Sequence, residues 1–375
     1  MPQRIIISVT SDLVTDQRVH RTASALKEAG YQVKVVGRKL RTSAELPGRR
    51  YRSHRFSLSF ERGPLFYAAY NLRLAWYLVW HHADILFSND LDTLPANFLI
   101  SRLKRIPLVY DSHEYFTGVP ELAQRPFIRR IWKSIEKSML PHIGHCITVN
   151  ESIAGLYRKE YGIEMTVIRN VPELRLQVLP EKEALRRELG LPVDKKLLII
   201  QGAGINIDRG AEEAVEMMQY LDEAVLIVAG GGDVIPRLKA MAASLRLSDK
   251  VVFIPKQPPA KLQRYTAAAD LGLSLDKDTN LNYRYSLPNK LFDYIHAGIP
   301  VLASDLPEVS RIVNKYGIGR IATEIRPENL ARQVKELLDD HAFLLDVRSN
   351  LPDAQKELNW DHERVKLLQL FWKLG

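Results

Sequence analysis

The stretch YSLPNKLFDYIHAGIPVLASD, residues 285–305, predicts a turn, a short helix, an abrupt stop and a buried strand. The apolar segment LGLSL at 271–275 precedes it, so the short helix connects two strands. Pro288 is tolerated in the first turn of a helix, whereas Gly298 and Pro300 end one. Because both strands are apolar throughout rather than alternating, we expect them to lie in a parallel sheet that is covered on both faces.

The same alternation of apolar strand and helical pattern runs along the whole chain. The strands that we expect are residues 5–9, 32–37, 84–90, 107–112, 145–150 and 165–170 in the first half, and 196–202, 224–231, 250–254, 271–275, 300–305 and 319–323 in the second. Each half therefore predicts a doubly wound α/β domain. In open sheets of this kind, ligands bind at the carboxyl ends of the strands.

A segment rich in prolines and charges separates the two series of strands. It lies between Asn170 and Lys195, and the second series begins directly after it. We therefore expect an N-terminal Rossmann-like domain at 1–175 and a C-terminal one at 176–353. The remaining residues, about 354–375, have apolar side chains near helical spacing, which predicts one amphipathic helix that packs back on the N-terminal domain.

Composition limits the class of protein. Of the 375 residues, 46% are hydrophobic, which is enough for two packed cores. The net charge of +9 suits nucleic acid, an anionic membrane or a phosphorylated substrate, but without a basic run or a nucleic-acid module we expect no nucleic-acid partner. The single cysteine, Cys146, excludes an intramolecular disulfide and favours a reducing compartment. The N-terminus turns polar too soon for a signal peptide, and no apolar run approaches the ~20 residues of a spanning helix, so we expect a cytoplasmic protein.

The start of the helix near Pro288 has the chemistry of an anion site. Ser286 or a neighbour can cap this helix, and Lys290 adds a full positive charge to the positive end of the helix dipole. The backbone amides that we expect to remain free are those of Leu287, Asn289 and Lys290. Asp293 follows on the same side of the helix, where its carboxylate can accept hydrogen bonds from ribose hydroxyls. The alternative is an ordinary capped helix with a surface Lys–Asp pair.

A second candidate site lies in QGAGINIDRGAEEAVEMM, residues 201–218, where a strand runs into a glycine-containing loop and a helix. Gly202 and Gly204 allow the backbone to approach a ligand closely, and Arg209 can pair with a phosphate through two hydrogen bonds. The third glycine of a dinucleotide fingerprint is missing, and a plain strand-to-helix turn is the alternative. Gly231, in the glycine-rich strand end VAGGG, is expected to line the base or the ribose.

Polar residues also follow the strands of the first half. The segment VYDSHEYF, residues 109–116, ends a strand with His113 and Glu114 close behind it, where side chains commonly face a cleft. From the opposite side, the loop before the first helix presents Asp16, Gln17 and Arg18 to the same cleft. A lone histidine is more often structural, so that interpretation of His113 stays open.

Together and in this order, these segments resemble glycosyltransferase family 4, retaining enzymes of the GT-B fold, with two Rossmann-like domains facing a central cleft. The resemblance covers essentially the whole chain and is most specific over SLPNKLFDYIHAGIPVLASDLPEV. It implies that Asp293 stands for the second of two glutamates seven residues apart, whereas the first falls on Tyr285. It also implies that the phosphate-binding arginine and lysine fall on Gly204 and Arg209, and that His113 is the histidine that approaches the reacting sugar.

What the resemblance implies for function is a hexosyltransferase. Such an enzyme moves a sugar from a nucleoside-diphosphate sugar, for example a UDP-sugar, to a glycan or lipid-linked acceptor, here in envelope or extracellular polysaccharide biosynthesis. The implied donor-binding residues are Gly202, Gly204, Arg209, Gly231, Tyr285, Ser286, Leu287, Pro288, Asn289, Lys290 and Asp293. The residues implied to be nearest the chemistry are His113, Arg209 and Lys290, and those on the acceptor side are Asp16, Gln17, Arg18, His113 and Glu114. No cofactor and no metal are expected, because no His/Cys cluster with ligand spacing stands out in the sequence.

Two other functions and one further partner stay open. A nucleotide-sugar 2-epimerase has the same architecture, and a catalytically inactive nucleotide-sugar-binding partner would explain Tyr285 and Gly204. The apolar segment 63–86 and the basic amphipathic segment 114–145 favour a peripheral contact with the anionic inner face of the cytoplasmic membrane. The alternative is a set of outer helices that simply pack on the sheet.

Overall fold

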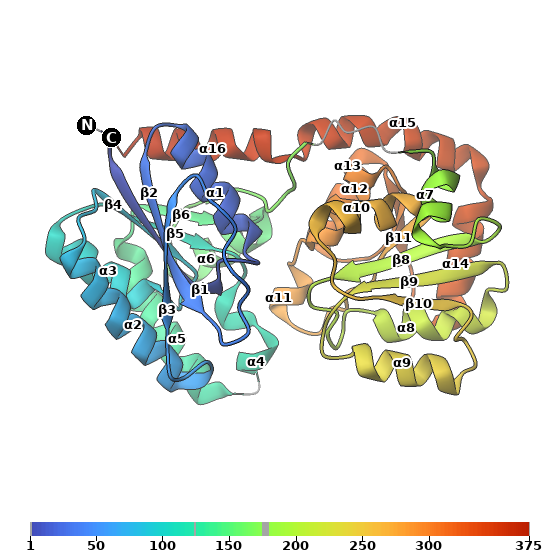
Figure 1. Cartoon of the computed structure of the whole chain (residues 1–375), viewed down its shortest axis with the longest axis horizontal. Helices are drawn as coiled ribbons and strands as arrows, with labels where there is room; N and C mark the ends of the chain where they lie inside the picture. The colour runs from blue at the N-terminus through green and yellow to red at the C-terminus, as the bar shows by residue number, and fades with distance from the viewer. Residues whose placement is uncertain (1, 124, 175–179, 375) are drawn as a thin grey trace. The chain divides into compact units, whose positions relative to one another are not determined.

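A computed structural model describes residues 2–123, 125–174 and 180–374 of the chain (Figure 1). The chain divides into two compact units: the N-terminal unit is Met1–Asn170 with His362–Gly375, and the C-terminal unit is Val171–Asp361. The division thus follows Asn170, whereas the sequence had suggested a boundary after residue 175.

The N-terminal unit contains one parallel sheet of seven strands in the order β3-β2-β1-β4-β5-β6-β7. The strands are β1 (Arg4–Asp12), β2 (Gln32–Lys39), β3 (Arg52–Ser57), β4 (Ile85–Asn89), β5 (Leu108–Ser112), β6 (His145–Thr148) and β7 (Met165–Val167). All of them except β3 are predicted by the sequence. The prediction missed β3 because its residues, RSHRFS, are mostly polar: β3 is an edge strand in which only Phe56 is buried.

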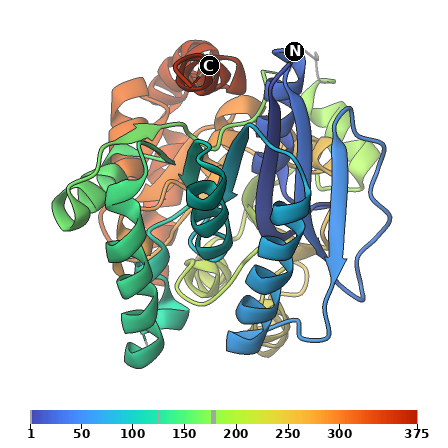
Figure 2. The same cartoon turned by 90° about the vertical axis from the view of Figure 1, so that its left-hand side faces the viewer.

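Helices cover both faces of this sheet. They are α1 (Gln17–Glu28), α2 (Gly63–Trp80), α3 (Leu94–Lys104), α4 (Pro120–Ala123), α5 (Pro126–Met139) and α6 (Glu151–Tyr161), with short 3-10 turns at Phe116–Gly118 and Leu140–His142. Figure 2 shows α2, α3 and α5 side by side on one face. The C-terminal helix α16 (Trp360–Trp372) also packs on this unit, because the buried Phe371 lies 6.0 Å from the Phe87 ring of β4 and 5.8 Å from the Tyr31 ring.

The C-terminal unit contains a parallel sheet of six strands in the order β10-β9-β8-β11-β12-β13, all of them predicted. The strands are β8 (Lys196–Gly202), β9 (Ala224–Gly230), β10 (Val251–Ile254), β11 (Leu271–Ser274), β12 (Val301–Ser304) and β13 (Gly319–Ala322). Its helices are α7 (Lys182–Leu189), α8 (Ala211–Glu216), α9 (Ile235–Ser244), α10 (Pro259–Ala268), α11 (Leu281–Arg284), α12 (Asn289–Ala297), α13 (Pro307–Tyr316), α14 (Pro327–Asp339) and α15 (His341–Glu357), with a 3-10 turn at Met217–Tyr220. Two parallel α/β units of this kind confirm the predicted fold class.

The short helix α12 packs directly on β11 because Gly272 has no side chain. A Cβ atom at Gly272 would lie 2.4 Å from the ring of Tyr294, closer than carbon atoms can approach. The buried Tyr294 hydroxyl donates to the carbonyl oxygens of Leu273 (3.0 Å) and Ile199 (3.2 Å), which ties α12 to two strands. The start of α12 is thereby held at the carboxyl edge of the sheet.

The C-terminal segment is not the single helix that the sequence suggested. The helix α15 ends at Glu357, and α16 begins at Trp360. The side-chain amide of Asn359 donates to the carbonyl oxygens of Gln355 (3.0 Å) and Lys356 (2.6 Å). These bonds satisfy carbonyl groups in the last turn of α15, where the helix ends. The Trp360 backbone amide then donates to the Pro172 carbonyl at 2.8 Å. This break lets α15 belong to the C-terminal unit and α16 to the N-terminal unit.

No helix in the described part of the chain combines the length and the apolar character needed to span a bilayer.

Replacing Phe371 tests how much α16 contributes to the N-terminal unit. Phe371→Ala should lower the unfolding free energy of this unit by about 3–5 kcal/mol, because it empties a buried aromatic site. The neighbouring Trp372, 63% exposed, is the matched control, and Trp372→Ala should change the stability by less than about 0.5 kcal/mol. Urea denaturation followed by circular dichroism measures both. Equal effects of the two substitutions would contradict the packing of α16 on the sheet.

Candidate active site

The first turn of α12 lacks a side-chain cap. Its N-cap residue is Pro288, which cannot supply one, and no side chain bonds to its first amides. Ser286 does not cap the helix as expected, since its hydroxyl donates to the Tyr283 carbonyl at 2.9 Å instead. The preceding short helix α11 does have a side-chain cap: the Asn280 side-chain oxygen accepts a hydrogen bond from the Tyr283 backbone amide at 2.9 Å. The start of α12 therefore keeps the amides and the dipole that favour an anion.

A buried carboxylate joins the two cations that the sequence singled out. Asp276 is 1% exposed and lies 2.8 Å from the Lys290 ammonium and 2.8 Å from the Arg209 guanidinium. Burial would raise the pKa of Asp276, but the charges of Lys290 and Arg209 outweigh it and lower that pKa. The Arg209 guanidinium also lies over the Tyr283 ring, 4.3 Å from its centroid. The Asp276 carboxylate thus holds the Lys290 and Arg209 side chains close to each other.

Neighbouring strands bring these groups together. Asp276 follows β11, and Arg209 lies in the loop after β8, the strand paired with β11. Gly210 permits close contact between the two loops: its φ is +73°, and a Cβ atom there would lie 2.3 Å from the Leu275 carbonyl oxygen. The Lys277 amide donates to the Asp208 carbonyl at 2.9 Å, which ties the loops together. Sequence analysis missed Asp276, although a carboxylate just beyond a buried strand is a signal that was available.

Asp293 lies on α12, close after Lys290, and is already oriented. Its carboxylate accepts a hydrogen bond from the side-chain amide nitrogen (Nε2) of Gln201 at 3.0 Å. The side-chain oxygen (Oε1) of Gln201 accepts a hydrogen bond from the Thr266 hydroxyl at 2.6 Å. Gln201 itself is buried at the end of β8. Asp293 therefore belongs to the same strand-end region as Arg209 and Lys290.

The glycines that the sequence singled out after β8 and at the end of β9 differ in whether their surroundings require a residue without a side chain. The Gly231 amide donates to the Gly202 carbonyl (3.1 Å), and the Ile205 amide donates to the Gly231 carbonyl (2.8 Å), so the ends of β8 and β9 pack backbone to backbone. A Cβ atom would lie 1.9 Å from the Gly202 carbonyl oxygen at Gly230 and 2.1 Å from the Ile205 carbonyl oxygen at Gly232, so tight backbone packing is sufficient to explain these two glycines. At Gly231 a Cβ atom would meet the Lys256 side chain, at 2.6 Å. At Gly204 a Cβ atom would find its nearest neighbour at 3.5 Å, so the surroundings do not require glycine there.

The remaining donor-side residues lie in the segment before α12. Tyr285 follows α11, and its ring centroid is 5.8 Å from the Arg284 guanidinium. Leu287 is half-buried and packs against the hydrophobic core of the C-terminal unit, so its side chain is structural. Asn289 opens α12 and is exposed. The segment from 281 to 293 contains one carboxylate, Asp293.

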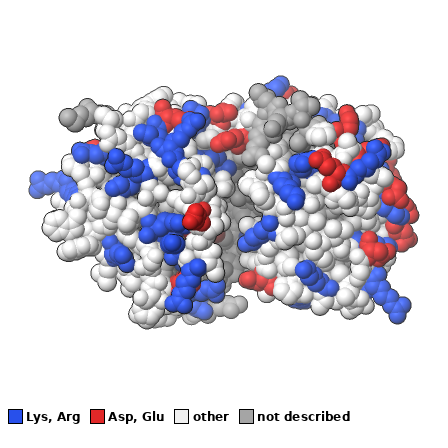
Figure 3. All heavy atoms as spheres, viewed as in Figure 1, with Lys and Arg blue, Asp and Glu red and all other residues white. Residues whose placement is uncertain are grey.

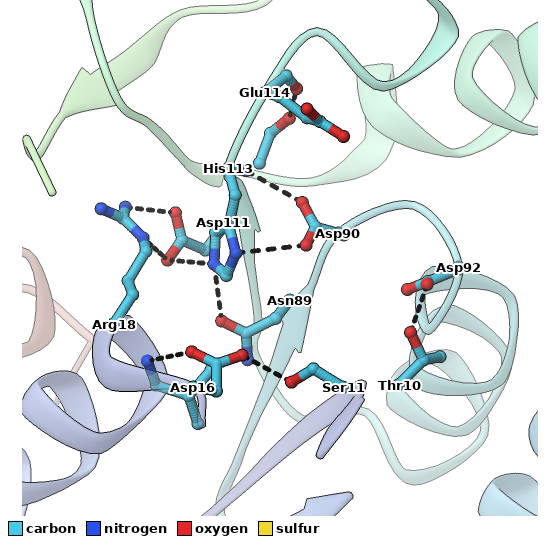
Figure 4. Close-up of polar contacts among 12 residues, drawn as sticks. Thr10, Ser11, Asp16, Arg18, Asn89, Asp90, Asp92, Asp111, His113 and Glu114 are labelled. Carbon is cyan, nitrogen blue, oxygen red and sulfur yellow. Dashed lines mark hydrogen bonds and ion pairs between the residues drawn. The ribbon is translucent and has the colours of Figure 1, made fainter. Parts of the chain in front are cut away.

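The N-terminal unit holds a second polar cluster at the ends of β4 and β5 (Figure 4). The Arg18 guanidinium donates to both carboxylate oxygens of Asp111, at 3.0 and 2.6 Å, and to the Ile168 carbonyl at 2.9 Å. Burial would raise the pKa of Asp111, but the Arg18 charge outweighs it and keeps that pKa well below its usual range. Because Arg18 is 5% exposed, it positions Asp111, and the expected acceptor contact of Arg18 is not supported by this geometry.

His113 lies between two carboxylates. Its Nδ1 is 3.2 Å from Asp90, and its Nε2 is 3.4 Å from Asp111 and 3.2 Å from the Asn89 amide oxygen. Burial would lower the pKa of His113, but Asp90 and Asp111 outweigh it and raise the pKa to about 9. Asp90 and Asp111, the second of which also pairs with Arg18, together provide the counter-charge of the imidazolium. An imidazolium with both nitrogens donating cannot act as a general base near pH 7.

The other residues expected on the acceptor side lie around this cluster. Asp16 caps α1: its carboxylate accepts from the Val19 amide at 3.0 Å and from the Ser11 hydroxyl at 2.5 Å. Gln17 begins α1 and is exposed. Glu114 is exposed as well, and Figure 4 shows its side chain away from the cluster around His113.

The carboxylate of Asp90 was missed by sequence analysis. Asp90 takes a left-handed backbone conformation, with φ of 57°, and its carboxylate accepts from the His113 amide at 2.9 Å. A signal was present, because the strand predicted at 84–90 ends in Asn89-Asp90 and the strand next in the chain ends just before His113. Only the pairing of β4 with β5 shows that these two ends meet.

Family models match both units. The model described as Glycosyltransferase Family 4 matches residues 16–172, and the one described as Glycosyl transferases group 1 matches residues 181–356. The two Rossmann-like sheets and these matches define a GT-B glycosyltransferase. The chain belongs to glycosyltransferase family 4, which confirms the resemblance seen in the sequence.

Similar proteins agree with this class. Chitobiosyldiphosphodolichol beta-mannosyltransferase of Candida albicans is 22% identical over 76% of this chain and 68% of its own length. The chain spans about half the length of other curated relatives that it matches. Among solved structures, sucrose-phosphate synthase from Thermosynechococcus elongatus has a TM-score of 0.83 at 18% identity and covers 99% of both chains. Anabaena HepE in complex with UDP-glucose has a TM-score of 0.78 at 15% identity and covers 99% of this chain and 100% of its own. At these identities, the structural likeness shows the fold.

The charge of His113 predicts how stability depends on pH. The folded-state pKa of about 9 lies above the ordinary 6.5, so protonation favours the folded state: the contribution is complete below pH 6.5 and is lost as the pH rises through 9. The wild type should therefore lose up to about 3 kcal/mol across this window, and His113→Gln should lack this part of the slope. Chemical denaturation at several pH values measures the difference. Parallel pH profiles for the two proteins would show that folding does not raise the pKa of the imidazole.

Proposed function

We propose that this chain is a retaining hexosyltransferase that moves a sugar from a nucleoside-diphosphate sugar to a glycan or lipid-linked acceptor. The observation that carries the proposal is the pair of cations, Lys290 and Arg209, held by one buried carboxylate beside the uncapped start of α12. Two cations and free helical amides suit a diphosphate better than a single phosphate or a carboxylate substrate. In this proposal the C-terminal unit binds the donor and the N-terminal unit binds the acceptor.

The proposed step breaks the bond between the anomeric carbon and the β-phosphate oxygen of the donor. Negative charge then develops on the diphosphate, where Lys290, Arg209 and the α12 amides stabilise it more strongly than in the ground state. Asp293 would hold the ribose hydroxyls, with Gln201 keeping its carboxylate in place. UDP is our first choice of nucleotide, and its support is that HepE was solved with UDP-glucose.

The acceptor proton needs a destination other than His113. Because its imidazole is already charged and both of its nitrogens donate within the unit, we propose that the departing phosphate takes the proton. The new bond then forms on the face that the diphosphate leaves, which is retention. His113 would contribute positive charge near the reacting sugar. We also propose that no metal is required, because side-chain cations supply the charge that the diphosphate needs.

A lipid-linked acceptor is the form of the proposal that we favour. Its support is the Candida albicans relative, whose name specifies a dolichol-linked chitobiosyl acceptor. We therefore infer a role in envelope or extracellular polysaccharide synthesis, with the protein working from the cytoplasm on the inner face of the cytoplasmic membrane.

A panel of UDP-, GDP- and dTDP-sugars tests the proposal. Nucleotide release that depends on an added glycan or lipid-linked acceptor, and that persists in EDTA, is the expected result. Conversion of the donor into another free nucleotide sugar would favour an epimerase instead. Proton NMR of the product's anomeric signal would then decide between retention and inversion.

A catalytically inactive binding partner is the second candidate. Tyr285 stands where the family signature has its first acidic residue, and Gly204 stands where it has a phosphate-binding arginine. Tight donor binding by calorimetry, with no nucleotide release on any acceptor, would favour this candidate.

The cation pair gives the sharpest test of donor binding. Lys290→Met and Arg209→Met should each lower kcat/KM for the donor about tenfold or more, because each removes a charge from the diphosphate. Lys315 is the matched control, since it is an exposed lysine of the same unit that pairs with the exposed Glu357. Lys315→Met should leave the kinetics unchanged.

Loss of stability must be separated from loss of phosphate binding. Each single substitution leaves Asp276 short of a partner, which lowers stability. The double variant Lys290→Met with Asp276→Asn removes both members of one buried pair and leaves only Arg209, which is 27% exposed and which water can solvate, without its carboxylate. It should therefore be more stable than Lys290→Met alone, while its donor affinity stays low. Thermal denaturation and calorimetric titration with UDP measure the two properties. Wild-type affinity in the double variant would refute the phosphate role of Lys290.

Asp293→Asn tests the ribose contact. It should raise the apparent KM for the donor about tenfold, the typical effect of losing one charged hydrogen bond, and leave the KM for the acceptor unchanged. Steady-state kinetics with each substrate varied in turn measures both values. An unchanged donor KM would mean that the carboxylate serves only to hold Gln201.

A further inference from the structure

The helix α2 is apolar on its outward side as well as on its inward side. The inward side chains recur every four residues and are buried: they are Phe66, Tyr70, Leu74 and Leu78. The outward side chains are Leu65, Leu72, Trp76, Val79 and Trp80, and they are between 39% and 75% exposed. A helix that faces water normally carries polar residues outward, so the outward side of α2 lacks the partner that its composition calls for.

The neighbouring helices extend this surface. Leu99 and Leu103 on α3 are 61% and 69% exposed, and Phe127 and Ile131 on α5 are 71% and 47% exposed. Because α2, α3 and α5 lie side by side on the same face of the sheet (Figure 2), these four side chains and the five of α2 form what we call the apolar face. Exposed apolar groups concentrated on neighbouring elements mark an interaction site, whereas single ones are ordinary.

Charges on the same three helices have one sign at the surface. Arg73, Arg102, Arg130 and Lys137 are exposed. The one acidic residue within α2, α3 and α5 is Glu136, which is fully buried and bonded to the Tyr161 hydroxyl (2.6 Å). Lys and Arg also predominate over Asp and Glu on the part of this unit visible in Figure 3.

We propose that the apolar face docks on an anionic lipid leaflet. The rings of Trp76 and Trp80 lie edge to face, 5.7 Å apart, and tryptophans on an amphipathic helix enter the boundary between headgroups and acyl chains. Arg130 and Lys137 would then meet lipid phosphates. This inference rests on the proposed function in one respect: a lipid-linked acceptor gives the contact its purpose.

The charges beside the apolar face disfavour a dimer in which a second copy of the chain covers it. In a two-fold dimer the same patch meets itself, so Arg130 and Lys137 would approach cations of the partner, and α2, α3 and α5 offer no exposed carboxylate to compensate them. An anionic leaflet compensates those charges and the tryptophans together. The observations therefore favour lipid over a copy of this chain.

Vesicle sedimentation with the full chain tests the proposal. Wild type should bind vesicles of phosphatidylglycerol mixed with phosphatidylcholine, and Trp76→Ser with Trp80→Ser should weaken this binding about tenfold or more. Trp372→Ser is the matched control, because Trp372 is an equally exposed tryptophan of the same unit outside the apolar face, and it should bind as the wild type does. Arg130→Gln with Lys137→Gln should weaken binding to the anionic vesicles about tenfold and leave binding to phosphatidylcholine alone unchanged.

Each outcome bears on the proposal. Equal binding by the double tryptophan variant and the Trp372→Ser control would overturn it, as would a wild type that ignores vesicles. A concentration-dependent dimer that only the double tryptophan variant abolishes would also overturn it, in favour of a contact between copies. The readout needs no turnover, so a chain that binds vesicles and releases no nucleotide refutes the proposed function alone. A chain that glycosylates a soluble acceptor and ignores vesicles refutes this inference alone.

Discussion

The candidate site depends on the cost of burying Asp276. An isolated carboxylate loses several kcal/mol of solvation when it leaves water, so the fold tolerates one only where cations and hydrogen bonds replace the solvent. Lys290 and Arg209 supply that compensation, and in doing so they are fixed beside the start of α12. The ion pair contributes little net stability by itself, but it fixes the position of two charges before any ligand arrives. Preorganised charge of this kind costs no reorganisation when a phosphate binds.

The N-terminal unit also compensates a buried carboxylate with an arginine, and there the ion pair is more deeply buried. In each unit an arginine after the first strand in chain order reaches a carboxylate at the carboxyl end of another strand: Arg209 reaches Asp276, just after β11, and Arg18 reaches Asp111, near the end of β5. The Arg18 pair is closed, at 5% and 2% side-chain exposure, whereas Arg209 remains 27% exposed. The closed pair positions its neighbour His113, while the exposed part of Arg209 can still contact a ligand. Lys290, at 9% side-chain exposure, is nearly as enclosed as Arg18, so its proposed role in binding rests on its place at the start of α12. The same interaction therefore has a structural role in one unit and, in the proposed function, a binding role in the other.

The sequence predicted most of the fold because parallel strands buried on both faces leave a strong apolar signal. It failed where tertiary contacts decide: β3 is a polar edge strand, and the break between α15 and α16 depends on Asn359 and on a distant carbonyl, that of Pro172. The cations Lys290 and Arg209 were found because each stands at a recognisable loop or helix start. Their counter-charge was not, because only the pairing of β8 with β11 brings Asp276 between them. In the same way, Asp90 needed the pairing of β4 with β5 before its place beside His113 could be seen.

The helix α2 shows why composition alone leaves a surface undetermined. Apart from Asn71 and Arg73 its sequence is apolar or aromatic on every side, so periodicity cannot say which side faces the sheet, and both Leu74 and Trp76 would pass as core residues. The structure buries Leu74 completely and leaves Trp76 68% exposed. Keeping tryptophan in water gives no stability to the folded chain, and exposed apolar clusters favour association. A surface that carries this liability together with exposed cations suits a partner that is apolar and anionic at once, and the lipid leaflet that we propose has both properties.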